Sequence, residues 1–268
     1  MKNVLLITLA CIIGAAVGTV GRAQNMPQLH LKESPSPEVT LTPFSEGQFP
    51  AFGRIFTQAR TGLQSAAFVV SNQSDRAVIG IAVRWTVVTQ DGSRVPFRSS
   101  THMYLSHPPT SPVAPAGARL LVAPDTFVPE SLVTSGGGII GLAPGRGTVS
   151  NFTAASQIYA EVDCIIFGDG EVVGLDQSQL VAEIQDRKAA VDAVLKQVHA
   201  AQANGESLSD VLSQLATSAR PAYDSVARHT SQLAFELAGT QHREALLAYL
   251  ESIPTPVNFY RKDGGALR

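Results

Sequence analysis

The sequence predicts an α+β fold in which an N-terminal antiparallel β-sandwich is followed by a C-terminal helical region. In the strands expected between residues 64 and 174, apolar residues alternate with polar ones at the period of two that is typical of strands. Beyond Leu175 they recur at helical spacing instead. Asp-Gly pairs at positions 91–92 and 169–170 are turn residues that favour hairpins between antiparallel strands.

Residues 158–174 form the clearest strand and hairpin. One face is apolar and consists of Ile158, Ala160, Val162, Cys164 and Ile166. The opposite face is polar and solvent-facing at Tyr159, Glu161 and Asp163 but becomes apolar at Ile165 and Phe167. Because a strand covered on one side only should stay polar on the other, we expect the following helix to cover this outer face near Phe167.

Four acidic residues in and after this hairpin raise the question of a calcium site: Asp163, Asp169, Glu171 and Asp176. A calcium-binding loop of the EF-hand type needs oxygen ligands at alternate positions and a terminal Glu, and that spacing is missing. We therefore expect Asp169 to serve the turn and Asp176 to cap a helix, with the other two facing water.

Earlier strands are expected at residues 64–71, 78–90, 94–105 and 117–123. The strand 78–90 should direct Ile79, Ile81, Val83, Trp85 and Val87 to one face. Its other face carries Gly80, Ala82, Arg84 and Thr86. Trp85 alternates with aliphatic residues, so we interpret it as a core residue rather than a platform for sugars.

Helices are expected after Gly174. The first carries an apolar stripe of Leu180, Ile184, Val191, Val194 or Leu195, and Val198, which Arg187 interrupts. It should begin at Asp176 and end at Asn204-Gly205. A second helix is capped by Ser207 or Ser209, a third follows Pro221, and a fourth lies within residues 241–251 before Pro254 and Pro256.

The N-terminus is typical of a bacterial secretory signal peptide. Lys2 precedes an apolar run over residues 4–20, and Gly21-Arg22-Ala23 suits cleavage near Ala23. Retention of the segment as an anchor is the alternative. Cleavage would leave Cys164 as the single cysteine, which allows no internal disulfide. These features predict a periplasmic or secreted protein.

The motifs of common enzymes and cofactor sites are missing from the sequence. The glycine-rich stretch 135–147 lacks the P-loop pattern and the flanks of a dinucleotide-binding unit. The histidines lack metal-binding spacing, there is no G-x-S-x-G motif, and Cys164 alternates with core residues. A net charge of -2 gives no basic footprint for nucleic acid. We therefore assign no catalytic, cofactor-binding or metal-binding residue.

The β region, over residues 52–174, resembles an immunoglobulin-like β-sandwich of bacterial secreted and envelope proteins. The resemblance rests on AAFVVSNQSDRAVIGIAVRW, the Asp91-Gly92 hairpin, Pro115-Ala116-Gly117 and VDCIIFGDG. Trp85 and Cys164 resemble the core Trp and second Cys of such domains, although Phe68 and Val70 replace the partner cysteine and Val162 replaces the usual tyrosine. The resemblance implies an accessory or binding role.

The expected organisation is a signal peptide (1–23), a Pro-rich linker (24–50) with one edge strand near 38–42, an Ig-like sandwich (51–175), a helical hairpin or bundle (176–253) and a tail (254–268). The leading hypothesis is a noncatalytic interaction or scaffold protein of the bacterial envelope, with an unknown protein partner or self-association through the helices. The alternative is a small-ligand or glycan-binding protein using loops 106–151 and the aromatics Tyr104, Phe127 and Phe152. A hydrolase with a dispersed site is less favoured.

Overall fold

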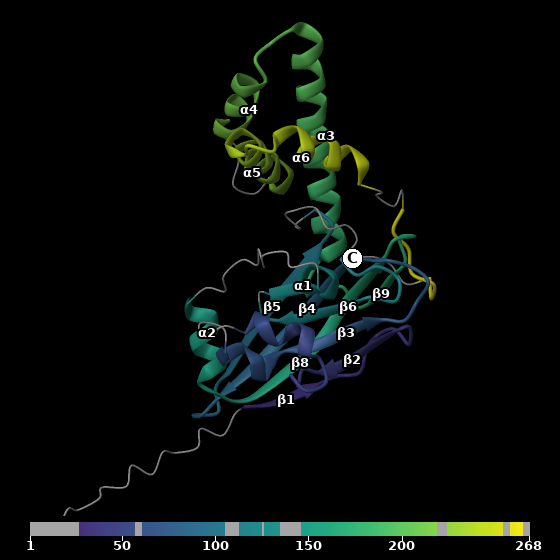
Figure 1. Ribbon diagram of the computed structural model, residues 1–268, viewed down its shortest axis with the longest axis vertical. Coiled ribbons are helices and arrows are strands. Elements are labelled where there is room, and N and C mark those ends of the chain that lie inside the picture. The colour runs from purple at the N-terminus through teal and green to yellow at the C-terminus, as the bar shows by residue number, and fades with distance from the viewer. Residues whose placement is uncertain are drawn as a thin grey trace, which may run out of the picture.

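Two β-sheets and a set of C-terminal helices make up the computed structural model (Figure 1). It describes residues 27–56, 61–104, 113–124, 126–134, 146–218, 224–253 and 258–264. The strands are β1 (Gln28–Leu31), β2 (Val39–Pro43), β3 (Phe68–Asn72), β4 (Val78–Thr89), β5 (Arg94–His102), β6 (Arg119–Ala123), β7 (Thr126–Pro129), β8 (Ala155–Phe167) and β9 (Val172–Gly174). The helices are η1 (Pro50–Ile55), η2 (Thr61–Ala66), α1 (Glu130–Thr134), α2 (Arg146–Thr153), α3 (Leu180–Asn204), α4 (Leu208–Thr217), α5 (Ser225–Gly239) and α6 (Arg243–Ser252). The predicted α+β class is confirmed.

The strands form two sheets. Sheet A has the order β1-β8-β4-β5, and β9 pairs with the edge of β8 that also carries β1. Sheet B has the order β2-β3-β6-β7 and is antiparallel throughout. In sheet A only β1 runs parallel to its neighbour, with Leu29 opposite Ile158. Both Asp-Gly hairpins form as predicted, and Gly92 and Gly170 adopt the positive φ values of 83° and 92° that such turns need.

The segment 24–50, predicted to be a linker, contributes a strand to each sheet within its described residues. β1 lies at the edge of sheet A, and β2 pairs with β3 at the edge of sheet B, where one strand was predicted. Proline-rich composition indicates an extended backbone, and an edge strand needs the same backbone. Composition alone therefore could not distinguish a free linker from a sheet edge.

An apolar core lies between the two sheets. Trp85 is confirmed as a core residue, since it is 1% exposed and its Nε1 donates to Ser99 Oγ at 2.9 Å. The Trp85 ring lies 5.6 Å from the ring of Phe68 and 5.9 Å from that of Phe152, between centroids. These contacts join β4 of sheet A to β3 of sheet B, and α2 closes one end of the core.

One extra residue in β8 reverses the predicted faces of its second half. The pairing register with β4 shifts at Asp163, so that alternation restarts one residue later. Ile165 and Phe167 therefore point into the core between the sheets, and the prediction that they face outward is wrong. Cys164 and Ile166 face the helices instead.

A second register shift, at Ile79 in β4, turns this residue outward although alternation predicts it inward. The next residue, Gly80, lies directly under α3. A Cβ at Gly80 would stand 3.1 Å from Cδ1 of Ile184 and 3.3 Å from Cδ2 of Leu180. The missing side chain therefore lets the helix approach the sheet closely.

Local signals set the ends of α3 and the start of α4. Asp176 accepts hydrogen bonds from the N–H groups of Leu180 (2.7 Å) and Val181 (3.3 Å), so it caps the helix as predicted, although the helix itself begins four residues later. Gly205 ends α3 in the left-handed conformation, with φ of 68°. Ser207, one of the two predicted caps, accepts from the N–H of Asp210 at the start of α4.

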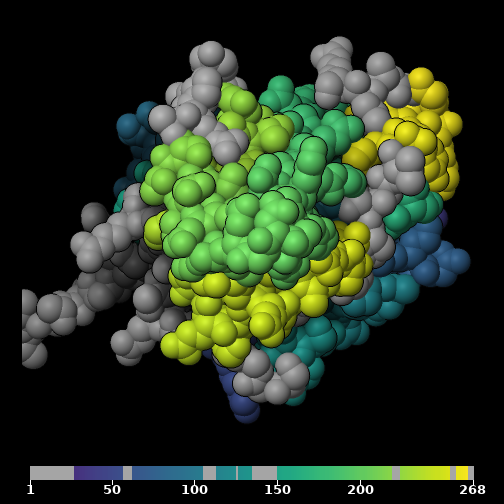
Figure 2. Space-filling model, turned by 90° about the horizontal axis from the view of Figure 1, so that it is seen from above, coloured from purple at the N-terminus to yellow at the C-terminus, as the bar shows by residue number. Residues whose placement is uncertain are grey.

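The helices cover one end of the outer face of sheet A. α3 rises from this face, and α4, α5 and α6 gather around its upper half (Figure 1). Seen from above, the green and yellow-green helical segments fill the centre of the view (Figure 2). The buried residues of the α3 stripe are Leu180, Ile184, Val191, Val194 and Val198. They share a cluster with Ile166 and Cys164, so the prediction that the following helix covers this face is confirmed.

Several predicted features lie outside the described residues. They are the signal peptide (1–23), all but the last two residues of the glycine-rich stretch (135–145), Pro221, Pro254 and Pro256. Within the described ranges, every helix is too short or too polar to cross a membrane.

Candidate binding groove

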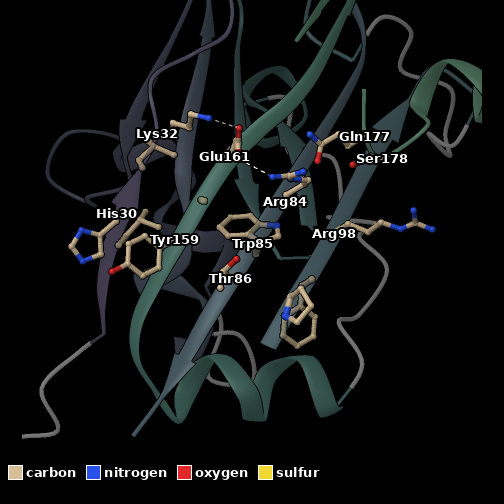
Figure 3. Close-up of a pocket in the computed structure, with 15 residues that line it drawn as sticks. His30, Lys32, Arg84, Trp85, Thr86, Arg98, Tyr159, Glu161, Gln177 and Ser178 are labelled. Carbon is tan, nitrogen blue, oxygen red and sulfur yellow. Dashed lines mark hydrogen bonds and ion pairs between the residues drawn. The ribbon is translucent and has the colours of Figure 1, made fainter. Parts of the chain in front are cut away.

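The outer face of sheet A is divided at the Asp163 bulge into a covered half and an open half. Beyond the bulge, Cys164 and Ile166 lie beneath the helices. Before it, Tyr159 and Glu161 project from β8 into an open groove of about 1030 Å³. We call this space the sheet A groove. Its polar lining comes from four strands or their ends and from the loop before α3: His30, Lys32, Arg84, Thr86, Arg98, Tyr159, Glu161, Gln177 and Ser178 (Figure 3).

The charged side chains of this lining are three cations and one carboxylate. Glu161 accepts hydrogen bonds from Lys32 Nζ at 2.6 Å and from Arg84 at 3.0 Å. The bond from Lys32 is the main reason why the pKa of Glu161 lies below its ordinary value. One carboxylate thus faces three cations, counting Arg98, so the groove carries a formal excess of two positive charges.

Arg84 and Arg98 stand directly opposite each other on β4 and β5. Like charges in this position destabilise a sheet. Arg84 has Glu161 as a partner, but Arg98 is exposed and makes no ion pair with any described residue. Its side chain extends away from Arg84 past the edge strand (Figure 3). The sheet therefore holds two arginines at facing positions of neighbouring strands, and Glu161 pairs with Arg84.

Two aromatic rings lie at the other end of the groove. The rings of His30 and Tyr159 stack with centroids 4.7 Å apart and planes 16° apart. Tyr159 is 38% exposed, and its hydroxyl donates to Gln157 at 2.8 Å. The His30 ring comes from β1, so the unpredicted parallel strand supplies half of this pair.

The loop before α3 closes the upper end of the groove. The N–H of Ser178 donates to Oδ2 of Asp163 at 2.7 Å, which ties the loop to the bulge. Burial raises the pKa of Asp176, against the lowering effect of its helix-capping hydrogen bonds, and the charge of Asp163 raises it further. Asp163 and Glu171 are 2% and 4% exposed, so the prediction that they face water is wrong.

The acidic residues of the hairpin have structural partners. Asp169 and Glu171 both accept from Arg76, at 2.8 and 2.5 Å, and Lys262 lies 2.8 Å from Glu171. Arg76 also contacts Glu38 at 2.5 Å, so it connects the β8–β9 hairpin to the segment before β2. The described part of the chain shows no group of three or more His, Cys, Asp or Glu side chains that could hold a metal ion.

The other residues singled out from the sequence lie apart from the groove. Cys164 is fully buried, and burial, followed by the charges of Asp176 and Asp163, raises the pKa of its thiol far above the ordinary value. Tyr104 is buried beneath the helices and Phe152 in the core between the sheets. Phe127 is half-buried against that same core. The three aromatics proposed for a ligand site in loops 106–151 therefore do not form one exposed cluster, and residues 106–112 and 135–145 of these loops lie outside the described ranges.

A buried polar cluster lies between β5 and the helices. His102 is fully buried, and burial lowers its pKa. Its Nδ1 accepts from the N–H of Tyr104 at 3.3 Å, and its Nε2 lies 3.6 Å from Oε1 of Glu183. Ser100 donates to the other oxygen of the same carboxylate at 3.4 Å. The carboxylate thus bonds to the serine hydroxyl itself, which is not the serine-to-histidine hydrogen bond that activates a nucleophile.

The groove has the chemistry of a binding surface for anions. Fixed guanidinium and ammonium groups can hold carboxylates or phosphates, and the adjacent ring adds an apolar contact. Sequence alternation predicts Arg84 and Thr86 on the face opposite Trp85, and Tyr159 and Glu161 on a face that begins polar, but it contains no signal that places β1 beside them. Comparisons with protein-family models, with curated proteins and with solved structures give no match to this chain.

Proposed function

We propose that this chain is a noncatalytic binding protein that holds an anionic ligand in the sheet A groove. The observation that carries the proposal is the placement of Arg98 opposite Arg84 on neighbouring strands, with Glu161 as the one carboxylate beside them. Natural sheets avoid like charges in this position, and departures from such local rules are concentrated at functional sites. An anion bound between the two arginines would relieve their repulsion.

The groove supports binding better than catalysis. Lys32 and Arg84 are held by Glu161, and Arg98 is free to turn toward a ligand. A hydrolase needs a nucleophile and a base within hydrogen-bond reach of each other. Ser178 lines the groove, but its hydroxyl is buried and makes no hydrogen bond with any described residue, so no described base activates it. The groove therefore favours a fixed electrostatic surface over a reaction centre.

The wider setting that we propose is the bacterial envelope. The N-terminal residues 1–23 support a secreted or periplasmic protein, and the single remaining Cys164 fits a fold that does not depend on disulfides. Two packed sheets with Trp85 in their core support an Ig-like domain as the scaffold of the groove. The second role that we propose is self-association through the helices. Phe235 on α5 is 72% exposed and would lie in the contact between two copies.

Binding to anionic polymers tests the proposed function. The chain would be titrated by calorimetry with polyglutamate, polyphosphate and polygalacturonate, and with neutral dextran, at 20 and 150 mM NaCl. We expect at least one anionic polymer to bind, with an affinity that falls as salt screens the charges.

The double variant Arg84→Gln/Arg98→Gln should lose about tenfold or more in affinity, because charge-assisted hydrogen bonds are the strong ones. The matched control is Arg54→Gln/Lys196→Gln, which removes the same charge from exposed positions outside the groove. If no anionic polymer binds, or if the control weakens binding equally, the proposal is wrong.

A further inference from the structure

We infer that the anionic ligand is a carboxylate-bearing saccharide, an inference that rests on the proposed function. Its basis is the combination, within one groove, of an exposed aromatic ring, a pair of cross-strand arginines and neutral polar side chains. Each of these features excludes some classes of anion, and together they favour an acidic sugar.

The position of the groove disfavours a peptide ligand. It lies on the face of a sheet, where only side chains are presented, because the backbone N–H and C=O groups lie in the plane of the sheet and bond to neighbouring strands. An extended peptide is usually bound through its backbone at a sheet edge, and a helical peptide needs apolar anchors in its groove. The apolar lining residues Leu29, Leu31 and Phe97 pack against the core between the sheets. Apart from Pro96, which is exposed opposite Thr86, the side chains on the open surface are polar or amphipathic.

The aromatic pair points to a ring-shaped apolar contact. Tyr159 presents an exposed aromatic side chain, and stacking on His30 holds its orientation. An amphipathic ring of this kind suits a ligand that is apolar on one side and wet on the other, as a sugar ring is. A single-stranded nucleic acid would need several aromatic platforms for successive bases, and Tyr159 is the one exposed aromatic residue in the described lining of the groove.

The spacing of the platform and the charges matches one sugar with an acidic substituent. Tyr159 lies opposite Thr86, and the next residue pair on the same face is Glu161 opposite Arg84. Two residues along a strand span roughly 6.7 Å. A sugar ring resting on Tyr159 would therefore place a carboxylate on its rim within reach of Arg84 and, after rotation, of Arg98. Gln177 is exposed at the upper end and offers an amide to hydroxyl groups.

Glu161 repels a phosphate more strongly than a carboxylate. Glu161 lies in the same row as the arginines, so a ligand group beside Arg84 also faces a negative charge. A phosphate monoester carries up to about two negative charges at neutral pH, whereas a carboxylate carries one. The repulsion from Glu161 is therefore smaller for the carboxylate, but so is the attraction to the three cations of the groove. The choice of a carboxylate-bearing sugar thus rests on the aromatic platform and its spacing from the arginines.

Calorimetry with defined oligomers tests the inference. The probes are oligogalacturonates and oligoalginates, the methyl-esterified oligogalacturonate, polyglutamate and polyphosphate. We expect an oligouronate to bind at least tenfold more tightly than its neutral ester and more tightly than the other two anions. Tyr159→Ala should weaken that binding at least fivefold, and Tyr159→Phe, which keeps the ring, should bind like the unchanged chain.

The outcomes separate the two proposals. If polyglutamate or polyphosphate binds as tightly as the oligouronates, and Arg84→Gln/Arg98→Gln abolishes that binding, the groove binds anions but the saccharide assignment is wrong. Equal affinities of Tyr159→Ala and Tyr159→Phe for an oligouronate would also overturn it. If none of the anions binds, both the proposed function and this inference fail.

Discussion

Replacing Arg76 by Met should weaken the fold substantially, because this one side chain joins three carboxylates. Its guanidinium contacts Glu38, Asp169 and Glu171, and it lies 4.0 Å from the centroid of the Phe167 ring. Glu171 is the decisive partner, since its side chain is 6% exposed whereas those of Glu38 and Asp169 are 40% exposed.

The magnitude follows from these exposures. The two exposed pairs contribute about 0.2–1 kcal/mol each. Removing one partner of a buried pair costs about 3–5 kcal/mol, but Lys262 still lies 2.8 Å from Glu171 in the variant and reduces that cost. We therefore expect the free energy of unfolding to fall by about 2–3 kcal/mol at pH 7.

The loss of unfolding free energy caused by Arg76→Met should become smaller at acidic pH. Burial opposes the ionisation of Glu171, but hydrogen bonds from Lys262 and Arg76 outweigh it, so the pKa of Glu171 lies below its ordinary value of 4.5. Burial also opposes the ionisation of Asp169, but hydrogen bonds from Arg76, from the N–H of Glu171 and from Tyr260 outweigh it and lower its pKa. A lowered pKa in the folded state adds stability above the ordinary pKa, and this stability disappears as the pH falls through the folded value. The difference between Arg76→Met and the unchanged chain should therefore narrow below about pH 4.5.

Urea unfolding followed by the fluorescence of Trp85, the single tryptophan, measures this difference at pH 7 and at pH 3.5. Arg54→Met is the matched control, because Arg54 is exposed on η1 and should change stability by less than about 0.5 kcal/mol. A loss at pH 7 no larger than that of the control, or a loss that grows in acid, would refute the reasoning.

Two further predictions concern the backbone and a buried histidine. Gly174→Ala should prevent stable folding, because φ is +103° and the new Cβ would stand 2.2 Å from the carbonyl oxygen of Asp163, whereas Gly92→Ala, with positive φ but open space, should cost about 1 kcal/mol in thermal unfolding. A soluble, cooperatively unfolding Gly174→Ala protein would contradict this. Burial, then Arg187 and Arg228, lowers the pKa of His229 to about 4, so the folded state resists its protonation. Stability should fall by about 1–2 kcal/mol between pH 6.5 and 4 through this group, and His229→Gln should flatten that part of the pH profile.

The sequence predicts the long strands and the C-terminal helices well because their patterns are local. The strand expected over residues 64–71 is shorter, since residues 64–66 belong to η2, and β7, α1 and α2 were not predicted. Alternation identifies β4 and β8, and the caps at Asp176, Ser207 and Gly205 mark the ends of helices. Alternation mispredicts the second half of β8, because the bulge at Asp163 has no distinctive residue type that would reveal it. The bulge nevertheless reverses the face of the sheet on which each later side chain lies. The apolar residues on both faces beyond this point are compatible with either register.

The groove likewise could not be predicted from local sequence patterns, because it depends on strands that are far apart in the chain. Alternation on single strands predicts that Arg84 lies opposite the Trp85 face and that Tyr159 faces water, but their neighbours depend on which strands pair. Each residue of β1 pairs with a residue of β8 that lies 129 positions later in the chain, and this parallel pairing brings His30 beside Tyr159. Non-local pairing of this kind is set by the burial of the whole sheet and has no local sequence signal.

The Asp163 bulge therefore explains both halves of the outer face. Because alternation restarts there, β8 turns apolar side chains toward the helices beyond the bulge and keeps polar ones toward solvent before it. The same Asp163 accepts the Ser178 N–H and so holds the loop that leads into α3. One inserted residue thus gives the sheet an apolar surface on which the helices pack, and it holds the loop at the upper end of the groove in place. A ligand in the groove would contact the loop that starts α3, so binding should also protect the base of that helix from hydrogen exchange.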